Sequence, residues 1–478
     1  MDGEKTIAEL RSAGSDYKLG FYTQTKYKYD FGTGINEQLI REISRIKEEP
    51  EWMLKHRLNS YAEFLRRPTP VWGYPDLDKD MDFTSFYYYS PPNAKLTNDW
   101  ENVPQEIKDT YEKLGVPEAE RKILAGSLSV FDSDSVVVKL RKQWEDKGVI
   151  FTDMDTALKE HPDLVKKYFM KAVPCTDNKF AALHGAVWSG GPFVYIPPGV
   201  KIDTPMQTYF RMNRKDGAQF EHTLIIADKG SQVTWVEGCS APVFEPNSRA
   251  LHAAIVEVFV EEAAKVKFIS AENWSRNVYN LNTKRAIVQK NGAMEWVEAT
   301  LGSKVTMLYP ASYLHGDGAS SSNLTVSFAQ PGTWKDSGSK VLMFGQNQSA
   351  KIISKSISMG GGSAVYRGLL RINKGAKNAK AYTQCDSLLL DDKAVTSTFP
   401  HNEVLNSSAK IYHEATVGKI SQEKLFYLMS RGFTESQARS LIVLGFLDSV
   451  LKEIPLEFAV EINRLIETEI STLPGATG

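Results

Sequence analysis

The chain has 478 residues, long enough for one large body with smaller appended units. Its 57 Lys and Arg nearly cancel its 58 Asp and Glu, so no whole-protein field favours nucleic acid or an anionic membrane, and neither partner is expected. Three widely spaced cysteines argue against a secreted disulfide framework. With no signal-peptide pattern and no apolar stretch of membrane-spanning length, a soluble cytoplasmic protein is expected.

The first third of the chain favours short helices. Apolar residues recur at helical spacing over residues 35–46, 52–65 and 135–144. An irregular aromatic stretch over 83–92 lies between them and is typical of packing or of a crossing loop. We therefore expect a helical and irregular N-terminal domain over residues 1–175.

Short β-branched runs separated by turn residues dominate from residue 176 to 415. A run at 193–196 precedes Pro197-Pro198-Gly199, and a small-residue turn followed by Lys or Gln recurs at 230–233, 263–266, 302–305 and 348–352. Similar phrases at 349–354, 378–383 and 408–413 begin about thirty residues apart, a period typical of a solenoid. A two-sheet sandwich would instead place turns about ten residues apart. The pattern predicts a mainly β fold with a parallel β-helix core.

The final segment, residues 416–478, returns to a helical pattern. Ser421 is a candidate cap for a helix that ends at Gly432, and residues 434–437 have the Thr-x-x-Gln form of a capping box. Pro455 separates a last helix whose apolar positions are Phe458, Val460, Ile462 and Leu465. This domain is expected either to seal the end of the solenoid or to dock a partner.

Common enzyme motifs are missing from the sequence. It has no phosphate-binding Gly-x-x-x-x-Gly-Lys loop, no His-Glu-x-x-His, no Gly-x-Ser-x-Gly and no dinucleotide fingerprint. Gly360-Gly361-Gly362-Ser363 carries no lysine to hold a phosphate and predicts a bend. Without a Cys-x-x-Cys pair, structural zinc is not expected. The sequence thus predicts a chain that is not an enzyme and has no ATPase site of its own.

The thirty-residue repeat predicts one chemically useful cluster. When the last two repeats are aligned on their alanines, 379 and 409, the paired positions are Thr383 with His413 and Gln384 with Glu414, with Cys385 directly after. Thiolate, imidazole and carboxylate together form a ligand set suited to iron. Strand alternation places Cys385 and His413 on one face and Glu414 on the other, unless a bulge intervenes. A buried thiol beside a surface His–Glu pair is the alternative for these residues alone.

Cys239 follows Gly238 in a second notable phrase, Trp235-Val236-Glu237-Gly238-Cys239. The glycine would admit close approach of another backbone. On its own, however, a single buried cysteine behaves mostly as a small hydrophobic residue. The third thiol, Cys175, lies outside these phrases and is expected to be structural.

Several long phrases resemble signature stretches of the SufB family. They lie at residues 195–200, 236–239, 366–368, 383–389, 413–416 and 455–461, and the likeness runs from about residue 35 to the end. The paralogous SufD family shares the fold and part of the C-terminal pattern. The phrases around Cys385 and His413-Glu414 favour SufB.

The resemblance implies a right-handed parallel β-helix flanked by N-terminal and C-terminal helical domains. It implies a scaffold for de novo iron–sulfur cluster assembly in the SUF system. The implied partners are a SufC-type ATPase on the C-terminal helices, SufD or a second SufB on the β-helix, and a cysteine desulfurase system as sulfur donor. Whether a reduced flavin supplies electrons stays open.

The resemblance also implies roles for individual residues. Cys239 would accept sulfur, and the transient cluster would be held by Cys385 with Glu414 and the less certain ligand His413. The positions that match the family's sulfur-transfer route are Arg211, Asn213, Glu272, Trp274 and Lys284. Glu272 departs from the family, where glutamine is expected, and this acid makes the route less secure.

Two alternative functions are weighed against the scaffold. A SufD-like structural partner would share the fold but lack ligand chemistry at Cys385. A β-helix enzyme acting on polysaccharide would usually be secreted and would need clustered catalytic carboxylates or a calcium site in its coils. The sequence shows neither a signal peptide nor Asp-rich coils.

Overall fold

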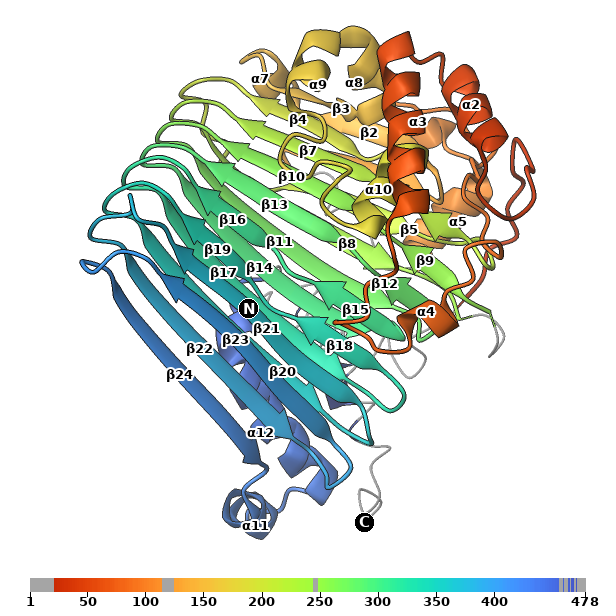
Figure 1. Ribbon diagram of the computed structural model, residues 1–478. Coiled ribbons are helices and arrows are strands. Elements are labelled where there is room, and N and C mark those ends of the chain that lie inside the picture. Colours follow the sequence, from red (N-terminus) through yellow and green to blue (C-terminus); the bar gives the residue numbers. More distant parts are fainter. Residues whose placement is uncertain are drawn as a thin grey trace.

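A parallel β-solenoid forms the body of the protein in the computed structural model (Figure 1). The structure describes residues 21–113, 124–243 and 248–454, together with six single residues between 459 and 470. Its strands form two large sheets that face each other across a shared core. The predicted mainly β solenoid with flanking helices is confirmed.

The first sheet has ten strands, and its later strands are nine or ten residues long. In spatial order these strands are β2 (Asp134–Leu140), β1 (Gly126–Phe131), β5 (Met206–Arg211), β8 (Gln232–Ser240), β11 (Lys265–Trp274), β14 (Ala293–Gly302), β17 (Ser320–Ala329), β20 (Ser349–Ser358), β22 (Lys380–Leu389) and β24 (Lys410–Lys419). From β1 to β24 every neighbouring pair is parallel. Strand β24 is the free edge of this sheet.

The second sheet consists of two ladders that meet at β21 (Ser363–Ile372). The first ladder contains β3 (Ile150–Asp153), β4 (Pro192–Ile196), β7 (His222–Ala227), β10 (Ile255–Val260), β13 (Thr283–Val288), β16 (Ala311–Leu314) and β19 (Lys340–Met343). The second contains β6 (Ala218–Gln219), β9 (Ala250–His252), β12 (Val278–Asn280), β15 (Val305–Leu308) and β18 (Trp334–Ser337). Strand β23 (Val395–Val404) pairs with β21 and is the last strand of the second sheet along the solenoid.

The coil length follows the repeat seen in the sequence. The long strands from β8 onward begin at residues 232, 265, 293, 320, 349, 380 and 410, so the spacing stays close to thirty. The predicted turns precede several of them, with left-handed backbone at Gly230 (φ 67°) and Ala263 (φ 60°). Strands β22 and β24 pair in the register that the repeat predicts. Between β20 and β22 the register differs from the prediction by two residues, because Ser349 pairs with Lys380 and not with Asn378, where the matching phrase begins.

Most of the N-terminal helices gather at the first end of the solenoid (Figure 1). They are α2 (Glu37–Ile46), α3 (Glu51–Arg66), α4 (Leu77–Asp80), the 3₁₀ turn η1 (Trp100–Asn102), α5 (Gln105–Lys113), α7 (Lys142–Glu145), α8 (Met154–Glu160), α9 (Pro162–Tyr168) and α10 (Lys179–Val187). The predicted helices at 35–46 and 52–65 are confirmed. The helix predicted over 135–144 is wrong: the β-branched valines 136–138 pair with β1 as strand β2, and only the short α7 follows.

Two C-terminal helices, α11 (Gln422–Ser430) and α12 (Glu435–Leu451), follow the last coil. Ser421 caps α11, and Thr434 with Gln437 forms the predicted capping box of α12. Apolar residues of α12 pack on the outer face of the ten-stranded sheet in one cluster with Val297, Val326 and Ile357. The predicted last helix rests on residues 458, 460, 462 and 465, which lie outside the described residues. No helix among those described is long and apolar enough to cross a membrane.

Candidate functional site

Along the long strands, the side chains that face the solenoid interior change from apolar to polar. On β8 and β11 the inward positions are first apolar, as Val233, Trp235 and Phe268, and then become polar or ionisable. Because strands pair in register, equivalent positions form rows that run through the coils. The second half of each strand therefore gives the solenoid a buried polar interior.

Two such rows connect the coils of Cys239 and Cys385. The first row is Cys239, Glu272, Thr300, Ser327, Ser356 and Ser387, and the second is Glu237, Ser270, Glu298, Thr325, Ser354 and Cys385. Every member is buried. From β8 to β22 there are five strand steps, which corresponds to about 24 Å at about 4.8 Å per step. A continuous polar lane thus joins the two cysteines inside the protein.

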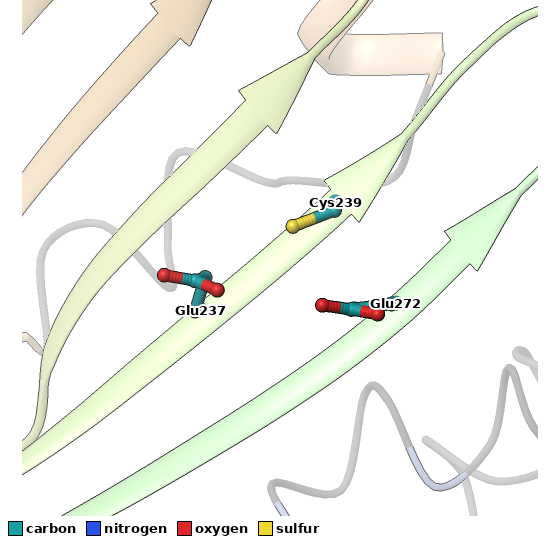
Figure 2. Close-up of side chains that lie close together, drawn as sticks. All are labelled: Glu237, Cys239 and Glu272. Carbon is teal, nitrogen blue, oxygen red and sulfur yellow. The ribbon is translucent and has the colours of Figure 1, made fainter. Parts of the chain in front are cut away.

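At the β8 end of this lane, three ligand-type side chains meet. Figure 2 shows Glu237 and Cys239 on one strand and Glu272 on the neighbouring strand. Glu237 and Cys239 are two residues apart and so share a face, while Glu272 pairs directly with Cys239. One donor atom from each lies within 4.8 Å of the other two. The Cys239 thiol is 2% exposed and has no hydrogen bond within the described structure.

Lys284 enters the same space from the opposite sheet, on β13. Its Nζ lies 3.0 Å from Glu298, 3.4 Å from Glu237 and 3.6 Å from Glu272. Burial lowers the Lys284 pKa, but the three carboxylates outweigh burial and raise it overall, so the ammonium stays charged. Burial also raises the pKa of Glu298 to about 8 and raises that of Glu237.

A second ionisable pair borders this cluster. Glu221 accepts a hydrogen bond from His252 Nε2 at 2.5 Å, and the ring's Nδ1 faces Asn280 Oδ1 at 2.8 Å. Burial lowers the His252 pKa, but Glu221 outweighs it and raises the pKa above its usual value. The other Glu221 oxygen, Oε2, is buried and has no hydrogen-bond partner among the described residues. The ring of Trp274 stacks obliquely on His252, with centroids 4.5 Å apart.

Burial, followed by the charges of Glu237, Glu272 and Glu221, raises the Cys239 pKa well above its usual value. Lys284 acts in the opposite direction but does not reverse this effect. The resting thiol is therefore protonated at neutral pH. A thiolate would form there only with further positive charge nearby.

The remaining route residues divide between two faces of the sheet. Glu272, Trp274 and Lys284 lie in the interior with Cys239. Arg211 and Asn213 lie on the other face. Arg211 Nη2 donates to Phe21 O at 2.6 Å and its Nη1 donates to Ser240 Oγ, on the residue after Cys239, at 3.1 Å. Asn213 Nδ2 donates to Thr23 O at 2.8 Å.

At the other end of the lane, Cys385 on β22 faces His413 on β24. Cys385 Sγ lies 3.7 Å from His413 Nε2, and Asn402 Nδ2 lies 3.4 Å from His413 Nδ1. Burial raises the Cys385 pKa to about 11, although a hydrogen bond from Tyr366 acts to lower it. A thiol and an imidazole on one face provide a sulfur and a nitrogen ligand for iron.

Glu414 lies on the opposite face of the same strand. The register of β22 with β24 runs without interruption from Lys380 with Lys410 to Leu389 with Lys419, so no bulge turns Glu414 inward. Its Oε2 accepts a hydrogen bond from the Tyr382 hydroxyl at 3.3 Å. The structure thus brings His413, and not Glu414, next to Cys385.

The second end of the solenoid is open to solvent. Strands β23 and β24 are ten residues long, and most of their residues are exposed. Their exposed apolar side chains are Val395, Phe399, Val404, Ile411, Tyr412 and Val417. Long unprotected edges of this kind are templates for pairing with another chain. A second exposed apolar group lies on and just after α11: Phe426, Tyr427, Met429 and Phe433.

Several residues of the two clusters were not singled out as ligands or route residues from the sequence: Glu221, Glu237, His252, Asn280, Glu298, Tyr366 and Asn402. A usable signal exists for Glu237. Aligning the turns before β8 and β11 pairs Gln232 with Lys265, and this register places Cys239 beside Glu272 with Glu237 on the same face. Glu221 and His252 come from the short strands and loops of the second side, where coil lengths vary and no such alignment is available.

Comparison with known proteins gives the family. Residues 210–446 match the family described as "SUF system FeS cluster assembly, SufBD core domain", and residues 96–208 match the "SufBD protein N-terminal region". An iron-sulfur cluster assembly SufBD family protein of Staphylococcus saprophyticus is 48% identical over 455 residues, which cover 95% of this chain and 97% of that protein. Proteins of the same family name from Staphylococcus haemolyticus and Staphylococcus aureus show the same identity and coverage. The chain therefore belongs to the SufBD family of iron–sulfur cluster assembly proteins.

Proposed function

We propose that this chain is the SufB-type scaffold of the SUF system, on which an iron–sulfur cluster is assembled and then passed to acceptors. The observation that carries the proposal is the buried polar lane between Cys239 and Cys385. One thiol lies at each end, and hydroxyls and carboxylates line the rows between them. A SufD-like structural partner would not require ligand chemistry at Cys385.

In this proposal Cys239 accepts sulfur from a cysteine desulfurase system. A donor persulfide, R–S–SH, transfers its outer sulfur to the Cys239 thiol, giving Cys239–S–SH and the donor thiol R–SH, with no net oxidation. Glu272, Trp274 and Lys284 line the start of the route, and Lys284 supplies the positive charge that favours an anionic sulfur. Arg211 and Asn213 act in the proposal by holding the N-terminal segment against β5.

The cluster is held as cargo at the other end. Cys385 and His413 supply the two ligands that share a face, and Glu414 serves as a ligand only after the edge strand or a partner chain rearranges. A single thiolate with weaker co-ligands leaves exchangeable positions, which suits a scaffold that must release its cluster. Persulfide sulfur needs two electrons to become sulfide, and a reduced flavin in the complex is the proposed source.

The proposed partners match the two exposed apolar surfaces. SufD or a second copy pairs with the open edge at β23 and β24, which places the junction beside His413. A SufC-type ATPase docks on the C-terminal helices, where Phe426 is 75% exposed. The chain itself acts as a cytoplasmic scaffold without its own ATPase site.

Anaerobic reconstitution with the ATPase partner, iron and sulfide tests the ligand assignment. We expect Cys385→Ala to lose the thiolate-to-iron absorption of the bound cluster, while the matched Cys175→Ala control keeps it. Cys239→Ser should keep chemical reconstitution but lose sulfur loading from a persulfide donor, read as one added sulfur atom by mass spectrometry. A Cys385→Ala chain with unchanged absorption would contradict the proposal and favour a SufD-like role.

A further inference from the structure

We infer that Glu237, Cys239 and Glu272 form a binding site for a divalent transition-metal ion of the Fe²⁺ class, inside the solenoid and separate from the Cys385 end. One carboxylate oxygen from each glutamate and the Cys239 sulfur lie within 4.8 Å of one another. An ion about 2.0–2.3 Å from each donor needs donors no more than about 4.6 Å apart. The donor atoms are therefore close to the separation that a shared ion requires.

The carboxylates of the site are oriented but not saturated. Asn280 Nδ2 donates to Glu272 Oε2 at 2.6 Å, an outer contact of the kind that fixes a metal-binding carboxylate. Lys284 makes its short contact, 3.0 Å, with Glu298, whereas its contacts with Glu237 and Glu272 are long at 3.4 and 3.6 Å. Asn282 Nδ2 also donates to Glu272 Oε1, at 3.3 Å, and Ser270 Oγ donates to Glu237 Oε1, at 3.5 Å. Because each carboxylate oxygen has two lone pairs and these contacts are long, both carboxylates can still accept an ion.

An unpartnered buried oxygen points to the same ligand. Glu221 is 1% exposed, and within the part of the chain that the structure describes its Oε2 has no hydrogen-bond partner. Glu221 interacts electrostatically with both Glu237 and Cys239, although it is not one of the three residues whose donor atoms lie within 4.8 Å of one another. A buried carboxylate with an unpaired oxygen is costly, and the charge of a cation bound nearby would offset that cost without direct ligation.

The charge balance favours a divalent ion. Four buried carboxylates, Glu221, Glu237, Glu272 and Glu298, face only two cationic groups, Lys284 and His252. Burial raises the Glu298 pKa to about 8, so this carboxyl is largely protonated at neutral pH. In formal charges, the other three carboxylates and a metal-bound Cys239 thiolate carry four negative charges against the two positive charges of Lys284 and His252. A divalent ion supplies the two positive charges that would otherwise be missing.

The donor set favours a metal ion of intermediate hardness, which binds both sulfur and oxygen. One sulfur with carboxylate oxygens suits Fe²⁺, Co²⁺ or Zn²⁺, whereas Ca²⁺ and Mg²⁺ take oxygen ligands alone. Binding follows Cys239–SH + M²⁺ → Cys239–S⁻–M²⁺ + H⁺, so it needs no oxidant or reductant. The bound ion supplies the positive charge that this thiol requires to ionise.

The experiment uses Co²⁺ as the probe on the full chain with Cys175→Ser and Cys385→Ala, so that Cys239 is the single thiol. Protein is kept anaerobic with Co²⁺ until binding no longer changes, since the site is enclosed. We expect a thiolate-to-Co²⁺ charge-transfer band and one more bound ion per chain than in the same background with Cys239→Ser. Glu272→Gln, which keeps the side-chain shape, should weaken binding at least tenfold, whereas Glu160→Gln, at an exposed position on α8, should leave the band unchanged.

Equal Co²⁺ binding with and without Cys239, or no Cys239-dependent band, would overturn the inference. Circular dichroism of each variant separates loss of the site from loss of the fold. The inference does not rest on the proposed sulfur route, because neither a persulfide donor nor cluster assembly enters the assay. A chain that binds Co²⁺ at Cys239 yet fails persulfide loading would retain this site and lose the proposed function.

Discussion

The substitution Thr325→Val should raise the stability of the protein and slow the transfer of sulfur along the polar lane. Thr325 lies between Glu298 and Ser354 in the second row and is 1% exposed. In the described structure its hydroxyl has no hydrogen-bond partner. Valine has nearly the same shape and removes that buried hydroxyl, whose desolvation costs about 1–3 kcal/mol. We therefore expect the variant to be more stable than the natural chain by about 1 kcal/mol, unlike most core substitutions.

Ser356→Ala is the matched control in the first row. The Ser356 hydroxyl lies 2.8 Å from that of Ser387, so removing it breaks a buried hydrogen bond and should cost about 1 kcal/mol. Urea unfolding followed by circular dichroism gives both differences as shifts of the midpoint at constant slope.

Sulfur transfer from Cys239 to Cys385 should respond differently from stability. We expect Thr325→Val to slow it about tenfold, as the loss of about 1.4 kcal/mol of polar stabilisation along the route would do. A Thr325→Val chain that is destabilised by 1 kcal/mol or more would refute the reasoning, because the hydroxyl would then be satisfied in solution. Unchanged transfer would remove Thr325 from the route.

Three further outcomes follow from the same structure. Because the Cys239 pKa is raised well above its usual value, Cys239 should be alkylated more slowly than Cys175 at neutral pH, and its alkylation should accelerate as the pH rises. Equal alkylation rates of the two cysteines, measured by peptide mass spectrometry, would contradict the buried cluster. Tyr412→Lys on the edge strand β24, where Tyr412 is 65% exposed, should prevent assembly with a second chain in size-exclusion chromatography and change stability by less than about 0.5 kcal/mol. Phe426→Ser should weaken binding of the ATPase partner at least tenfold, measured by calorimetry, whereas the exposed control Lys424→Ser should not. Equal affinities of the two variants would show that the partner does not dock on α11.

The solenoid could be predicted from the sequence because it repeats locally. Each coil uses a turn and a strand of similar length, so the spacing of the phrases near 349, 378 and 408 is close to the number of residues in one coil. The same local pattern fixed the pairing of Cys385 and His413. The family phrase favoured Glu414 as the partner, but backbone alternation decides which side chain faces inward.

Other features depend on contacts that the repeat does not encode. Residues 135–144 have a pattern compatible with a helix, yet the valines become strand β2 because β1 offers an edge for pairing. Arg211 and Asn213 precede the regular coils, and the N-terminal segment that covers them comes from about 190 residues away in the sequence. The convergence of Glu221, His252 and Lys284 on Cys239 likewise requires the second sheet to be placed against the first.

A single-turnover experiment with labelled sulfur tests the central claim most directly. Cys239 is first loaded from a labelled persulfide donor, excess donor is removed, and the label at each cysteine is followed over time with the ATPase partner and iron present. The buried lane predicts that the label leaves Cys239 and appears at Cys385, and that Cys239→Ser abolishes its appearance there. Label that reaches Cys385 equally fast in Cys239→Ser would contradict the account.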